Sequence, residues 1–106
     1  MTHYYTHGVP TEIGRKLLNS GMELKRDELT ESWLVPTYAE AIDWLLEKGM
    51  SVEIQKGIWR GCDWYAIVTE TDTHRWEVQR DKNDWYSVTN HAIERALILL
   101  KERTKQ

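Results

Sequence analysis

Two histidines near the start of the chain, His3 and His7, have the four-residue spacing of a metal-binding pair on a helix. The residues between them, 4–6, favour a helix poorly, and a closed metal site needs three or four ligands. No acidic residue or cysteine lies beside the pair. We therefore predict no metal and no cofactor, and we interpret residues 1–10 as a flexible arm or an edge strand.

A thiol nucleophile is the other chemistry that the residue types allow. Cys62 is the only cysteine, and either His74 or His91 would have to act as its base. A carboxylate such as the adjacent Asp63 raises the pKa of a thiol rather than lowering it. Cys62 also falls on the same side of a predicted strand as a set of apolar residues. The sequence also lacks the phosphate-binding, dinucleotide-binding and hydrolase motifs. We predict that Cys62 is a small core residue and that the protein is not an enzyme.

Rings and guanidinium groups interleave in the second half of the chain, which has 6 Trp and 5 Tyr in all and no Phe. Trp, Tyr and Arg are the residues that most often dominate the energy of protein interfaces. An alternative interpretation is that most of these rings fill the core, or lie under the N-terminal segment. The candidate binding surface consists of Trp59, Arg60, Tyr65, Arg75, Trp76, Arg80, Trp85 and Tyr86.

This surface predicts a non-catalytic module that binds a protein partner or a second copy of itself. The alternative function is single-stranded nucleic-acid binding, in which bases stack on rings beside arginines. Acidic residues slightly outnumber basic ones between Lys56 and Tyr86, so no positive field surrounds the rings. We therefore favour a protein partner or a homo-oligomer.

The clearest predicted element is a helix over residues 37–48. Thr37 and Glu40 have the spacing of a capping box, and Pro36 keeps the preceding residue extended. Apolar residues then recur on one helical face, and Gly49 provides a left-handed stop. A shorter helix is expected from about residue 11, with Thr11 as a possible N-cap.

Alternating residues after this helix predict a β-sheet. The expected strands cover residues 52–58, 62–69 and 75–79, and the second is apolar on both faces, which places it inside the sheet. Residues 85–88 are expected to pair as a fourth strand or to run irregularly. A final helix is expected from about residue 90 to 104, capped by Thr89 or Asn90.

Together these elements predict one α+β domain over residues 1–106. Its antiparallel sheet has three to five strands, and two main helices pack on one face. The order in residues 37–104 is helix, strand, strand, strand, helix, preceded by a short N-terminal helix.

The overall charge narrows the possible partners. The formal net charge is −3, from 14 Lys and Arg against 17 Asp and Glu. Duplex nucleic acid and anionic membranes normally require a positive excess, so we expect neither. No long apolar run predicts a membrane span. A single cysteine is typical of a reducing compartment, and we expect a cytoplasmic protein.

Residues 36–45 carry the segment P-T-Y-x-E-A-x-x-W-L, followed by Lys48 and Gly49. Together with Trp64 and Tyr65 and the later His91–Leu97 stretch, this segment resembles a group of small uncharacterised proteins carried by bacterial phages and prophages. The resemblance covers about the last two thirds of the chain. It implies a phage-derived accessory protein and transfers no activity or site residue.

Overall fold

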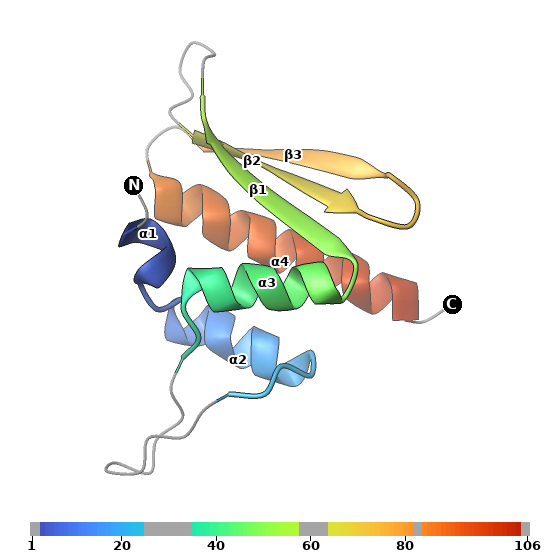
Figure 1. Cartoon of the computed structure of the whole chain (residues 1–106), viewed down its shortest axis with the longest axis horizontal. Coiled ribbons are helices and arrows are strands. Elements are labelled where there is room, and N and C mark those ends of the chain that lie inside the picture. Colours follow the sequence, from blue (N-terminus) through green and yellow to red (C-terminus); the bar gives the residue numbers. More distant parts are fainter. Residues whose placement is uncertain (1–2, 25–34, 58–63, 82–83, 105–106) are drawn as a thin grey trace.

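A computed structural model describes residues 3–24, 35–57, 64–81 and 84–104 of the chain (Figure 1). The described elements are α1 (His3–Thr6), α2 (Thr11–Asn19), α3 (Tyr38–Glu47), β1 (Met50–Lys56), β2 (Trp64–Glu70), β3 (Trp76–Asp81) and α4 (Trp85–Thr104). Their order confirms the predicted α+β class and the predicted order of helix, three strands and helix.

The three strands form one antiparallel sheet in the order β1-β2-β3. β2 is the central strand, as its apolar residues on both faces predicted. Val52 of β1 lies opposite Val68, and Ile67 lies opposite Val78 of β3. This register fixes which side chains share a face, because directly opposed residues point to the same side of an antiparallel pair.

Helices α3 and α4 lie on the same face of the sheet (Figure 1). That face presents Met50, Val52, Ala66 and Val68 to the helices, and all four side chains are buried. Helix α2 packs against α4 and lies farther from the sheet, so the molecule is built as sheet, helix pair and outer helix. Burial of the aliphatic residues between these layers is the main favourable term in folding.

Local signals fix the ends of α3. The Thr37 side chain accepts a 3.2 Å hydrogen bond from the Glu40 amide, and the Thr37 amide donates to Glu40 Oε1 at 2.9 Å, which confirms the capping box. Gly49 follows the helix with φ of +91°. A Cβ atom there would lie 2.6 Å from the far end of the flexible Arg103 side chain, which can shift, so the left-handed backbone conformation is what favours glycine.

The last helix begins five residues before its predicted start. Residues 85–88 are neither a fourth strand nor irregular, and Asp84 rather than Thr89 or Asn90 caps the helix, since Asp84 Oδ1 accepts a 3.1 Å hydrogen bond from the Tyr86 amide. Thr89 lies inside the helix, where its buried hydroxyl donates to the Trp85 carbonyl. The early start turns Trp85 and Val88 into the core.

The N-terminal residues also differ from expectation. The described part of the expected arm or edge strand contains the one-turn helix α1, and Gly8 then makes a single bridge to Thr37. Tyr4 of α1 stacks on Trp85 with ring centroids 4.9 Å apart. Helix α2 starts at Thr11 as predicted, but Pro10 holds its N-cap position and provides no side-chain cap.

Candidate interaction surface

The second face of the sheet has no helix of the described chain against it (Figure 1). The register places alternate residues of all three strands on this face, which we call the open sheet face. It comprises Ser51, Glu53 and Gln55 of β1, Tyr65, Ile67 and Thr69 of β2, and Trp76 and Val78 of β3. Two residues of the predicted binding surface, Tyr65 and Trp76, are among them.

Trp76 dominates the apolar part of the open sheet face. Its side chain is 63% exposed, the highest value among the large hydrophobic residues that the structure describes. Val78 follows on the same side of β3 and lies opposite Ile67, and both are half-buried. These three side chains form a continuous apolar strip across β2 and β3. Sequence reasoning missed Ile67 and Val78, although their parity with Tyr65 and Trp76 was a usable signal.

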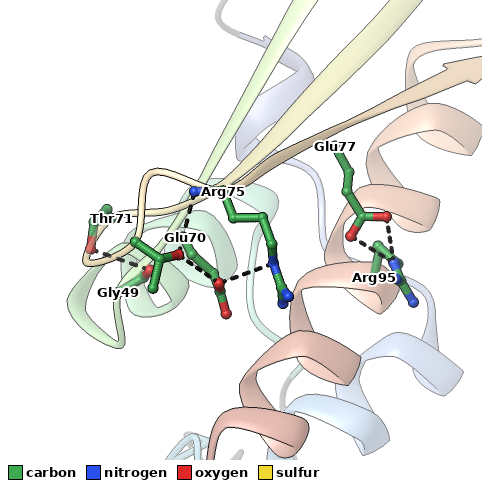
Figure 2. A network of polar contacts seen from close by, with 7 residues as sticks. Gly49, Glu70, Thr71, Arg75, Glu77 and Arg95 are labelled. Carbon is green, nitrogen blue, oxygen red and sulfur yellow. Dashed lines mark hydrogen bonds and ion pairs between the residues drawn. The ribbon is translucent and has the colours of Figure 1, made fainter.

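Strand β3 turns its apolar side chains away from the core. An antiparallel strand that covers a core normally directs its apolar residues inward and its polar residues to water. In β3 the inward side carries Glu77, which accepts hydrogen bonds from Arg95 Nε of α4 at 3.0 and 3.1 Å (Figure 2). This ion pair joins the polar side of β3 to α4, and the register leaves Trp76 and Val78 on the other side of the strand.

Polar groups border the apolar strip on the β1 side. Ser51, Glu53 and Gln55 form a polar row, and the Tyr65 hydroxyl donates a hydrogen bond to Gln55 Oε1. Glu53 is the acidic residue of this face, and it lies on the outer strand. Arg80, another residue of the predicted surface, pairs through its backbone with Tyr65 across β2 and β3.

Arg75 is separated from the other predicted site residues. It precedes β3 and forms an ion pair at 3.3 Å with Glu70, whose side chain is only 8% exposed (Figure 2). The Thr73 hydroxyl donates to the same carboxylate at 2.9 Å. Arg75 therefore neutralises a buried carboxylate at the turn between β2 and β3, and it is not part of the open sheet face.

Trp85 and Tyr86 are not on the sheet either, because both belong to α4. Trp85 is only 3% exposed, and it contacts the rings of Tyr4, Tyr5, Tyr38 and Tyr86 at centroid distances of 4.9 to 5.5 Å. These five residues form what we call the aromatic core cluster. For Trp85 the interpretation of the rings as core residues is therefore correct, and its place in the predicted binding surface is wrong.

Burial raises the pKa of the Tyr38 phenol above its usual value of 10.0. The phenol donates a 2.8 Å hydrogen bond to Asn90 Oδ1 of α4. This contact joins α3 to α4 at the edge of the aromatic core cluster. Tyr38 is therefore a structural tyrosine and does not contribute a polar group to the open sheet face.

The remaining predicted residues, Trp59, Arg60 and Cys62, lie outside the described part of the chain. Within residues 3–24, 35–57, 64–81 and 84–104, no three His, Cys, Asp or Glu side chains gather as a metal site. None of the helices described is long and apolar enough to cross a bilayer. Comparisons with protein-family models, curated protein sequences and solved structures yield no match to this chain.

Proposed function

We propose that this protein is a non-catalytic interaction module whose open sheet face binds the same face of a second copy. The observation that carries the proposal is the orientation of β3, which directs Trp76 and Val78 outward while Glu77 is paired beneath the sheet. Exposing a large indole costs free energy in an isolated domain, because apolar surface remains in contact with water. A partner that covers Trp76 recovers that free energy.

A second copy is the partner that the face suits best. Two sheets pack well when side chains from both faces interdigitate across a shallow angle. A two-fold axis through the apolar strip would place Ile67, Trp76 and Val78 against their counterparts. Glu53, on the outer strand, would then stay at the polar rim and would not meet its own copy in the apolar centre.

The size of the open sheet face predicts weak association. Three strands about 4.8 Å apart, with six residues of about 3.3 Å each, give a face of roughly 14 by 20 Å. A standard stable interface buries about 800 Å² on each partner, which is more than a face of this size provides. We therefore expect a weak, reversible dimer that forms only at high protein concentration.

Sedimentation velocity over a range of protein concentrations tests the proposal. The wild-type chain should shift from monomer to dimer as its concentration rises, and the Trp76→Glu variant should remain a monomer. Leu46→Glu is the matched control, because Leu46 of α3 is 53% exposed and lies away from the open sheet face. The control variant should dimerise like the wild type.

Two outcomes would overturn the proposal. One is a wild-type monomer at every concentration, and the other is a dimer that Trp76→Glu leaves intact. If the monomer also showed a salt-dependent Trp fluorescence quench with oligothymidylate, single-stranded nucleic-acid binding would take its place.

The proposed origin and location rest on sequence features alone. The resemblance of residues 36–49 to phage and prophage proteins supports a phage-derived accessory protein. The single cysteine supports a reducing compartment, and we include a cytoplasmic location in the proposal.

A further inference from the structure

Strand β3 forms one edge of the sheet (Figure 1). Among the residues that the structure describes, no strand pairs with its outer side. A strand at the edge of a sheet leaves N–H and C=O groups that can pair with a strand of another chain. We call the outer side of this strand the β3 edge.

The hydrogen bonds at the turn between β2 and β3 show which backbone groups point outward. The Glu70 amide donates to the Arg75 carbonyl at 2.8 Å, so these two residues form a hydrogen-bonded pair. Along an antiparallel ladder, such pairs alternate with pairs whose N–H and C=O groups point away from the partner strand. The alternation therefore directs the backbone groups of Trp76, Val78 and Arg80 outward from the β3 edge.

We propose that the β3 edge pairs with the β3 edge of a second copy, in an antiparallel register about a two-fold axis at Val78. In this register Val78 lies opposite its own counterpart, and Trp76 lies opposite Arg80 of the second copy. Each outward N–H and C=O group of these three residues then has a partner, which no other symmetric register provides. The two three-stranded sheets become one sheet of six strands.

The side chains on the helix side of β3 are compatible with this register. Glu77 would lie opposite Gln79 of the second copy rather than opposite its own counterpart, so a carboxylate would face a neutral amide. An inward-pointing charge on an edge strand normally opposes edge pairing. Here the charge of Glu77 is already paired with Arg95 of its own chain, which weakens that opposition.

Pairing at the β3 edge would also enlarge the apolar surface. Trp76 and Val78 lie on the edge strand itself, so the apolar strips of two copies would become continuous. The opposite edge of the sheet is β1, which carries the polar row, and pairing there would keep the strips apart. Six strands about 4.8 Å apart and about 20 Å long cover roughly 29 by 20 Å, which is closer to the size of a standard interface.

Edge pairing rests on the proposed contact between open sheet faces. Backbone hydrogen bonds formed at an edge replace hydrogen bonds to water, so their net contribution to association is small. Two copies paired at their edges therefore need the face contact as well. At high concentration the wild-type chain should form a species heavier than a dimer, and Trp76→Glu should form neither species.

Disulfide trapping tests the register. The variants Glu77→Cys and Gln79→Cys, each also carrying Cys62→Ser, are mixed and oxidised at a concentration at which the wild type associates. Across the paired edges the Cα atoms of the two new cysteines would lie about 4.5 Å apart, within the range that a disulfide spans. Identical positions would lie about 7–8 Å apart, so the mixture should cross-link at least about tenfold faster than either variant alone.

The same cross-link separates edge pairing from face packing. Glu77 and Gln79 alternate with Trp76 and Val78 along β3, so they lie on the helix side of the strand. A contact between open sheet faces alone does not bring these two positions together. Circular dichroism should show an intact fold for both variants, since Glu77 and Gln79 are only half-buried.

Charge substitutions at Gln79 provide a second test that needs no cysteine. Gln79→Glu would place two carboxylates opposite each other, so sedimentation velocity should show the dimer without the heavier species. Gln79→Lys would face Glu77 of the second copy, so the heavier species should appear at lower protein concentration than in the wild type.

Edge pairing would be overturned by equal cross-linking of the mixture and the single variants, or by identical behaviour of the two Gln79 variants. A wild-type dimer that never forms a heavier species would also overturn it and would leave the proposed function intact. A wild-type monomer at every concentration would overturn both.

Discussion

The tryptophans that the structure describes differ in their role. Trp85 stabilises the core, whereas Trp76 is exposed and available for contact with a partner. Trp85 is buried among tyrosines, and its ring connects α1, α3 and α4. Trp76 lies on a sheet face with most of its surface in solvent. The same residue type therefore has opposite energetic roles, because burial rather than identity determines its contribution to folding.

Trp85→Ala should destabilise the protein strongly. Removing a fully buried indole costs roughly 3–5 kcal/mol, from lost burial and from the cavity that remains. Urea unfolding followed by far-ultraviolet circular dichroism measures the loss. Trp76→Ala is the matched control and should change the free energy of unfolding of the monomer by no more than about 0.5 kcal/mol. Equal losses in the two variants would contradict this division of roles.

Tyr38 should titrate later than an ordinary tyrosine in the folded protein. Burial raises its pKa above 10.0 in the folded state, so the unfolded chain loses this proton first as the pH rises. The contribution of Tyr38 to stability is therefore complete below about pH 10 and is lost as the pH rises through the folded pKa. Absorbance at the tyrosinate band should show a step above pH 10 that belongs to Tyr38, and Tyr38→Phe should remove that step.

Elements with strong local signals were predictable from the sequence. The capping box and the left-handed glycine fixed both ends of α3, and the alternating residues of β1 and β2 identified a sheet. The start of α4 was missed because residues 85–88 contain two aromatic and one β-branched residue, which favour a strand in isolation. Tertiary packing of Trp85 and Val88 overrides that preference, and Asp84 was the local sign of a helix start.

Only part of the candidate surface was predictable from the sequence, because contacts between elements distant in the sequence decide which residues share a face. Parity groups Tyr65 with Ile67 and Trp76 with Val78 and separates Arg75 from Trp76, but only the register shows that the two groups share a face. Parity also gives no sign that Trp85 and Tyr86 are helical. The outward orientation of Trp76 and Val78 follows from the register of β3 with β2, and the ion pair of Glu77 with Arg95 accompanies it. These two residues are far enough apart in the sequence that no local pattern connects them.

Asp84→Ala should weaken the start of α4. An N-cap carboxylate replaced by alanine costs about 1 kcal/mol, because the amide of Tyr86 loses its partner. Thermal or urea unfolding measures this loss. Asp84→Asn should retain most of the stability, since asparagine is also a good N-cap, and the exposed Asp43→Ala on α3 serves as a control. A helix that started at residue 90 would give no difference between Asp84→Ala and the control.

The layered arrangement of the whole molecule leaves one face of the sheet without a helix of the described chain against it. The helix pair α3 and α4 lies between the open sheet face and the outer helix α2 (Figure 1). The open sheet face carries the apolar strip on β2 and β3 and the polar row on β1. Exposed residues of this face can therefore be substituted without disturbing the packing of the helices on the other side of the sheet.

Association through the open sheet face should be visible residue by residue in solution. Backbone amide chemical shifts of the isotopically labelled protein, recorded from low to high concentration, report which residues enter the contact. We predict the largest concentration-dependent changes at Tyr65, Ile67, Trp76 and Val78, with little change along α2 and the outer side of α4. Shifts that do not depend on concentration, or changes confined to α2 and α4, would contradict a dimer formed through this face.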